Sequence, residues 1–199
     1  MFRRQHAIVV SLCLPTLGLL SAACGDEEKA TPQAIFDGRL ELGGSNNNCR
    51  DVGELFLVGD FGNQASEPKV PSKPVKDGEA WDQGTTSVAC VVKPAGGDEF
   101  EVAATVALSG ATGGLFRVNG KFKATGEQTG INAVFSSRKS GNSYQQTDGQ
   151  CIVRYTTSYQ GVAAGRVWGE IICPRAENAS AQTECEGIAQ FRFENCGQE

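Results

Sequence analysis

Short runs of alternating apolar and polar residues recur along most of the chain. The clearest run covers residues 99–108, where every second position contributes to one apolar face, made of Phe100, Val102, Ala104, Val106 and Leu108. A repeat of two places one face of an extended strand against a core and the other toward solvent. This run is therefore predicted to be a half-buried β-strand.

Similar runs, rich in β-branched and aromatic residues, are separated by clusters of Gly, Asn, Asp and Ser, and signals for helices are almost absent. The candidate strands are Ala34–Leu42, Glu54–Gly59, Thr86–Lys93, Glu99–Leu108, Leu115–Lys123, Ile131–Ser137, Cys151–Ser158, Arg166–Cys173 and Ile188–Glu194. This pattern predicts an all-β domain over residues 34–199: a single antiparallel β-sandwich of about eight to nine strands, or alternatively a β-barrel.

Two of these runs predict their own pairing. If Cys151–Ser158 and Arg166–Cys173 form an antiparallel hairpin with its turn centred near Gly161–Val162, then Arg154 faces Glu170. Opposite charges that face each other across two strands stabilise the pair. This register is therefore the one we expect, with Ile188–Glu194 as the next strand.

The N-terminus carries the pattern of an export signal. Arg3 and Arg4 precede an apolar run from Ala7 to Leu20, which is too short to span a bilayer, and the small residues Ser21-Ala22-Ala23 lead to Cys24. The segment resembles the bacterial type II signal peptide and its lipobox, with Ser21 where such signals usually carry Leu.

The resemblance implies a lipoprotein. Residues 1–23 would be removed, the sulfur of Cys24 would carry an acyl chain such as palmitate, and residues 24–33 would form a short polar tether. Two or more acyl chains anchor a protein stably to a membrane. The expected location is therefore the bacterial cell envelope, at the outer membrane or the cell surface.

The remaining six cysteines predict disulfides, because an even set in an exported chain is normally paired. The closest spacings are 11 and 12 residues, so the set lacks the Cys-x-x-Cys pairs of zinc sites, and neither a metal nor another cofactor is expected. The hairpin register brings Cys151 opposite Cys173. The disulfide candidates are Cys49, Cys90, Cys151, Cys173, Cys185 and Cys196.

The partner of Cys196 is predicted by elimination. Cys185 and Cys196 lie at opposite ends of the last strand, separated by roughly 30 Å of extended chain, and cannot bond to each other. Cys196 is therefore expected to join Cys49 or Cys90.

Charge and composition exclude several functions. Residues 24–199 hold 16 Lys and Arg against 23 Asp and Glu, a formal charge of −7, which argues against nucleic acid as a partner. The single histidine, His6, lies in the signal, so histidine-dependent catalysis and histidine metal sites are excluded from the mature chain. The expected partners are a membrane, through the lipid, and an unidentified protein or glycan.

Carboxylate chemistry survives these exclusions. Asp98, Glu99 and Glu101 form the only tight acidic group in the body of the domain, but neither Ala103 nor Thr105 is an aromatic residue that could stack on a sugar. We therefore interpret these three residues as a solvated turn and strand start, without a catalytic role.

Trp168 is the residue most suggestive of binding. Alternation places it on one face with Arg166 and Glu170, where an indole could stack on a sugar or anchor a partner. The alternative is that Trp168 packs under a loop or fills a second core. Trp81, in a predicted loop, could serve the same role or cap one end of the sandwich.

The sequence as a whole favours a membrane-anchored envelope lipoprotein that acts as a non-enzymatic binding or structural module. One alternative is a carboxylate-dependent hydrolase of envelope polysaccharide. A second alternative is a subunit of an envelope assembly.

Overall fold

The computed structural model describes residues 29–43, 48–63 and 65–199. The predicted lipobox with Cys24 and the rest of the predicted signal segment lie outside the described residues. Within those three ranges, we find no helix of the length and apolarity needed to cross a bilayer.

The described chain is all-β, and every named strand pair is antiparallel. The strands are β1 (Gln33–Glu41), β2 (Gly53–Val58), β3 (Val75–Lys76), β4 (Ala80–Trp81), β5 (Gly84–Gly96), β6 (Glu99–Leu108), β7 (Gly114–Lys123), β8 (Gln128–Ser137), β9 (Asn142–Arg154), β10 (Gly161–Ala163), β11 (Arg166–Asn178) and β12 (Thr183–Glu194). The predicted all-β class is therefore confirmed.

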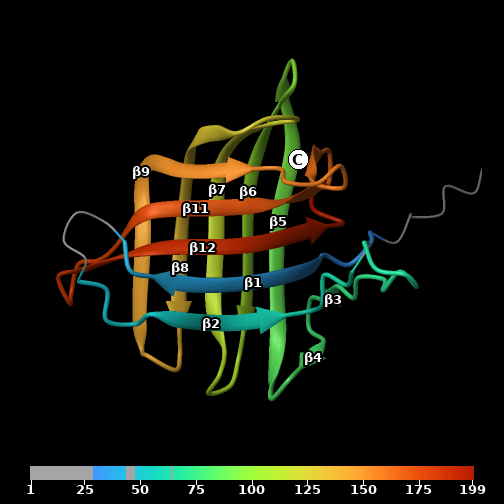
Figure 1. Cartoon of the computed structure of the whole chain (residues 1–199). Helices are drawn as coiled ribbons and strands as arrows, with labels where there is room; N and C mark the ends of the chain where they lie inside the picture. The colour runs from blue at the N-terminus through green and yellow to red at the C-terminus, as the bar shows by residue number, and fades with distance from the viewer. Residues whose placement is uncertain (1–28, 44–47, 64) are drawn as a thin grey trace, which may run out of the picture.

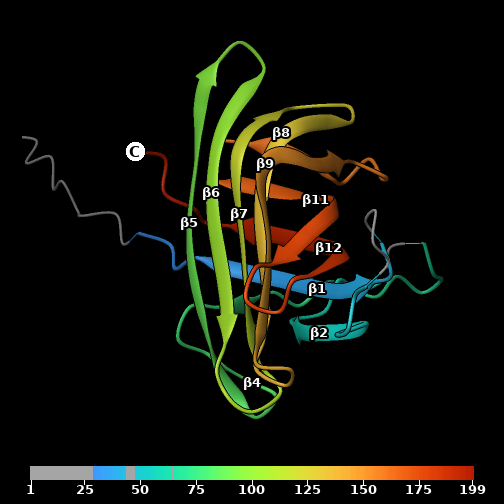
Figure 2. The same cartoon turned by 90° about the vertical axis from the view of Figure 1, so that its left-hand side faces the viewer.

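The strands form one sheet that folds onto itself in two layers. Its order is β2-β1-β12-β11-β9-β8-β7-β6-β5-β4, with β10 added beside β11 and β3 beside β1. Strands β5 to β8 run nearly perpendicular to β1, β2, β11 and β12, and β9 bends from one layer into the other (Figure 1). Seen from the side, the two layers face each other across the core (Figure 2). The sheet is nearly closed into a barrel, so both predicted architectures describe it.

The C-terminal segment closes one side of this barrel. Gly197 lies parallel to Val91 of β5, where it donates its N–H to the Cys90 carbonyl at 2.9 Å and accepts from the Val92 N–H at 2.8 Å. The disulfide Cys90–Cys196 reinforces the same junction. The sheet's two terminal strands, β2 and β4, are left at the other side.

Aromatic rings from both layers fill the core. Phe36 of β1 packs between Phe56 of β2 and Phe116 of β7, with ring centroids 4.5 and 4.6 Å apart, and Phe116 also contacts Phe191 of β12 at 5.7 Å. Burying side chains of this size removes a large apolar area from water, which is the main favourable term in folding.

The predicted register between the two C-terminal runs is confirmed. Arg154 of β9 faces Glu170 of β11, and the side chains form an ion pair with an Nε–Oε2 distance of 3.0 Å. The predicted turn near Gly161–Val162 is wrong, because those residues belong to β10, which pairs with β11 in its own register around a turn at Ala164-Gly165. The loop between Arg154 and Gly161 connects the two registers, that of β9 with β11 and that of β10 with β11. Gln160 holds this loop, because its Oε1 accepts a hydrogen bond from the Thr156 N–H.

All six candidate cysteines form disulfides in the structure. The bridges are Cys49–Cys185, Cys90–Cys196 and Cys151–Cys173, with Cα–Cα distances of 4.7, 4.8 and 4.2 Å. The predicted Cys151–Cys173 pair, the separation of Cys185 from Cys196 and the pairing of Cys196 with one of its two expected partners are thereby confirmed.

Candidate functional site

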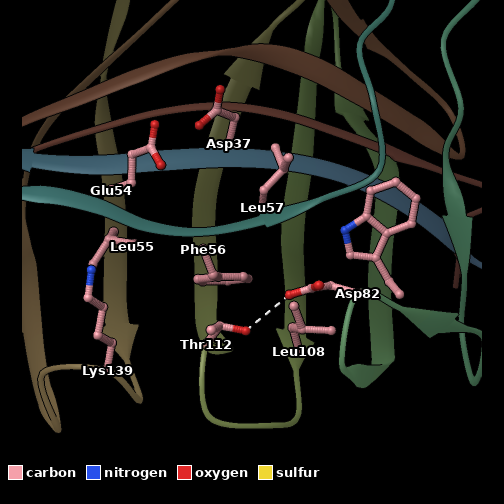
Figure 3. A pocket seen from close by; sticks show the side chains of 10 residues that line it. Asp37, Glu54, Leu55, Phe56, Leu57, Asp82, Leu108, Thr112 and Lys139 are labelled. Carbon is pink, nitrogen blue, oxygen red and sulfur yellow. Dashed lines mark hydrogen bonds between the residues drawn. The ribbon is translucent and has the colours of Figure 1, made fainter.

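A cleft of about 580 Å³ lies beneath the edge of β2, where the two ends of the sheet approach each other (Figure 3). Its walls come from β1 and β2 on one side and, on the other, from β4, the end of β6, the β6–β7 loop and the β8–β9 turn. Clefts of this volume are typical of ligand sites. Its apolar lining includes the side chains of Phe56, Leu57, Trp81 and Leu108.

Phe56 and Leu108 form the buried part of this cleft. They are 6% and 2% exposed, and the Phe56 ring also contacts Phe36 in the core. A register shift in the β1–β2 pairing, between Gly38 and Arg39, makes Leu55 and Phe56 both buried although they are consecutive. Leu57, the next residue, points outward and is 49% exposed.

Trp81 and Asp82 form the opposite wall. Trp81 ends β4 and packs, partly buried, against the core. Asp82 adopts a left-handed backbone with φ of 48° in the β4–β5 turn, and its Oδ2 accepts a hydrogen bond from Thr112 Oγ1 at 3.1 Å. This bond ties the β4–β5 turn to the β6–β7 loop and fixes the wall that holds Trp81. The sequence predicts that Trp81 either contacts a ligand or caps one end of the fold. The structure is compatible with both roles, because the indole packs on the core and also lines the cleft.

The rim of the cleft is acidic. Asp37 of β1 and Glu54 of β2 stand on the outer face of neighbouring strands, and Lys139 stands at the far end of the cleft (Figure 3). Desolvation by the flanking strands raises the pKa of Asp37, and the nearby Glu54 carboxylate raises it further, while Arg39 opposes both. In the described part of the chain, none of the three lining carboxylates, at Asp37, Glu54 and Asp82, forms an ion pair.

Trp168 lies on the outer face of β11 with Arg166 and Glu170, as the alternation predicts. The indole is half-buried: the rings of Phe61 and Tyr159 lie nearly parallel to it, with centroids 6.2 and 6.5 Å away. The two neighbouring loops that carry these rings therefore cover part of the proposed binding face.

The indole of Trp168 also contacts charge. The guanidinium carbon of Arg192 on β12 lies 4.9 Å from the ring centroid, a cation–π contact. The indole Nε1 is buried and has no hydrogen-bond acceptor. Packing beneath loops thus accounts for much of the indole surface, and the binding role of Trp168 stays a prediction.

The three acidic residues Asp98, Glu99 and Glu101 lie apart from the cleft and from Trp168, at the tip of the β5–β6 hairpin. Asp98 is in the turn, Glu99 starts β6, and Glu101 forms an ion pair with Lys93 at 3.4 Å. Across residues 29–43, 48–63 and 65–199, no group of three His, Cys, Asp or Glu side chains is arranged to hold a metal ion.

Sequence reasoning missed Asp37, Glu54, Leu57 and Asp82 as site residues. Their runs were predicted as ordinary strands or loops, and each residue is unremarkable alone. One signal was present: Glu54–Gly59 is followed by a long proline-containing segment before the next strand, a pattern that favours a position at the edge of a sheet.

Comparison with known proteins finds no family model, no curated protein and no solved structure that matches the chain.

Proposed function

We propose that the protein is a lipid-anchored lipoprotein of the bacterial cell envelope that acts as a non-enzymatic binding module and holds its ligand in the cleft beneath β2. The anchor is Cys24, supported by the charged, apolar and small-residue segments that precede it. Attachment through lipid leaves the disulfide-bonded domain outside the bilayer, facing the envelope.

The cleft is the observation that carries this proposal. It combines a buried apolar floor, a half-exposed leucine, a tryptophan and an acidic rim within about 580 Å³. Apolar lining with a few placed charges is the usual make-up of a specific binding site. The open junction between β2 and β4, the two ends of the sheet path, exposes these groups together.

Composition supports binding over catalysis. The chain beyond the signal has no histidine, and the six cysteines of the domain are in disulfides. The commonest general base and the thiol nucleophile are therefore missing from the cleft.

Photocrosslinking tests the binding role. p-Benzoylphenylalanine replaces Leu57 in the cleft or, as a control, Leu42, which is 57% exposed outside it. Irradiation of intact cells should give a discrete adduct for position 57 and none for position 42. The absence of any adduct at position 57, or the same adducts at both positions, would contradict the proposal.

One observation favours a second candidate function, a carboxylate-dependent hydrolase of envelope polysaccharide. Asp37 has a raised pKa beside Glu54, and Trp81 lines the same cleft. Glycoside hydrolysis uses two neighbouring carboxyl groups, the acid having a raised pKa, and an indole can stack on a sugar. Release of reducing ends from isolated cell-wall polysaccharide, lost in both Asp37→Asn and Glu54→Gln, would establish this function. No release by the unaltered protein would exclude it.

A further inference from the structure

Among the residues that the structure describes, no strand lies beside the outer edge of β2. The sheet path ends at β2, whose strand neighbour is β1, and β3 continues the same side of β1 further along. An edge of this kind presents backbone N–H and C=O groups that can pair with another extended chain.

β2 lacks two of the devices that block pairing, proline and lysine, although it carries a bulge at Leu55 and one charged residue, Glu54. Its sequence, Gly53-Glu54-Leu55-Phe56-Leu57-Val58, contains neither proline nor lysine, and Leu57 is 49% exposed. Natural edge strands are commonly protected by such residues or covered by another element. Pro68, Pro71 and Pro74 lie in the segment between β2 and β3, outside the edge strand itself.

The space beside this edge has two chemically different sides. Toward the interior lie Phe56 and Leu108, and toward the outer face lie the carboxylates of Asp37 and Glu54 (Figure 3). Trp81, which also lines the cleft, packs against the core. Side chains of a strand alternate between its two faces. A strand placed beside β2 would therefore meet apolar surface with one set of side chains and negative charge with the other.

The charged groups of the cleft determine which side chains of an added strand would fit beside the carboxylates. Three carboxylates, at Asp37, Glu54 and Asp82, stand against one ammonium group, at Lys139. Basic side chains complement this balance, and acidic ones are repelled by it.

We propose that the cleft receives an extended peptide segment of a partner protein, with alternating basic and apolar residues, which adds to the sheet as a strand beside β2. This inference rests on the proposed function and names the ligand of the same cleft. The backbone of β2 supplies affinity through hydrogen bonds, and the alternation of charge and apolar contact supplies register and specificity.

The test is a titration of the full chain with the synthetic peptide Ac-KVKVKVK-NH2. The controls are the same peptide N-methylated at every residue, which leaves no N–H to donate from either edge of the strand, and the acidic peptide Ac-EVEVEVE-NH2. The inference expects binding of the first peptide, with affinities about tenfold or more weaker for both controls. It also expects slowed amide hydrogen exchange of the bound protein within β2, residues 53–58.

Two variants assign the binding to the edge. Leu57→Lys should weaken Ac-KVKVKVK-NH2 binding about tenfold or more, because it places a positive charge against basic peptide side chains. The matched variant Leu42→Lys, at a residue of similar exposure away from the cleft, should leave binding unchanged. Glu54→Lys leaves two carboxylates and two ammonium groups in the cleft, so it should remove most of the preference for the basic over the acidic peptide.

The inference is overturned if Ac-KVKVKVK-NH2 does not bind, if the N-methylated peptide binds equally well, or if the slowed exchange lies outside β2. If any of these results is found together with a discrete photoadduct at position 57 whose crosslinked ligand resists proteases, the combination would support the binding function and indicate a non-peptide ligand. Loss of both the photoadduct and peptide binding would remove the binding function as well.

Discussion

The ring of Phe56 lies directly over Gly114, so that a Cβ on residue 114 would come within 2.6 Å of Phe56 Cδ1. The same Cβ would lie 2.2 Å from the Ser136 carbonyl oxygen on β8. Glycine is therefore required at the start of β7 because the floor of the cleft and the neighbouring backbone occupy the space of a side chain. The position of β2 against the core depends on this contact between Phe56 and Gly114.

Gly114→Ala should destabilise the protein by about 1–3 kcal/mol, the usual cost of overpacking. The backbone of Ser136 cannot yield as a flexible side chain would. Urea denaturation measures the change. Gly197→Ala is the control, because its Cβ would meet no atom closer than 3.6 Å. Equal stabilities for the Gly114→Ala variant and the unaltered protein would show that Phe56 does not lie on this glycine.

Tyr155 should titrate far above an ordinary tyrosine. Burial raises the pKa of Tyr155 to about 12, although a hydrogen bond from Gln128 acts in the opposite direction. The folded state thus holds this proton more tightly than the unfolded chain, whose tyrosine pKa is near 10. The stabilisation is complete below pH 10 and is lost as the pH rises toward 12. Tyrosinate absorbance should show a step near pH 12 whose amplitude falls by one tyrosine in Tyr155→Phe, because burial also raises the pKa of Tyr144; an unchanged amplitude would contradict this assignment.

Trp168→Ala should cost about 1–2 kcal/mol, less than the loss of a fully buried aromatic residue. The indole is half-buried and contacts Phe61, Tyr159 and the Arg192 guanidinium. Thermal and urea unfolding measure the cost. An unchanged stability would indicate a freely exposed indole available to a ligand, whereas a loss of several kcal/mol would make Trp168 a core residue and end its role as a binding face.

Cys24→Ala should release the protein from membranes, because the proposed acyl chains are its attachment. Fractionation of cells grown with labelled palmitate should find label on the unaltered protein and none on the variant. Intact-mass analysis that finds the mature N-terminus elsewhere, without lipid, would contradict the anchor.

Removal of the long-range disulfides should cost more than removal of the short one. In the chain-entropy account, a bridge across 106 residues contributes about 5 kcal/mol and one across 22 residues about 3 kcal/mol. The double variant Cys90→Ala/Cys196→Ala should therefore be less stable than Cys151→Ala/Cys173→Ala in urea. The reverse order would show that the junction between β5 and the C-terminal segment holds without its bridge.

The register of β9 with β11 could be predicted because it depends on residues close in sequence whose charges and apolar side chains match only in one alignment. The first half of β9 could not be found in the same way. Its buried positions hold Tyr144 and Gln146, and the Gln146 Oε1 accepts the Arg175 N–H at 2.9 Å. A buried glutamine whose side-chain oxygen bonds a distant backbone N–H looks polar in the sequence, so the alternation is hidden.

The cleft was beyond prediction for a different reason. It exists because β2 and β4 end the sheet on facing sides, and the order of strands is set by contacts between residues far apart in the chain. Local alternation puts Glu54 and Leu57, which are three residues apart, on opposite faces, whereas the bulge at Leu55 turns both outward. Nor does local alternation say which strand stands beside them.

Each disulfide has one cysteine among the final residues: Cys173, Cys185 or Cys196. If the chain is delivered across a membrane N-terminus first, Cys49, Cys90 and Cys151 all emerge before any of their partners. No native bridge can then form until nearly the whole chain has crossed, and any bond made earlier among these three has to be exchanged. Maturation of the protein would therefore depend on a disulfide isomerase or on a chaperone that keeps the early thiols apart.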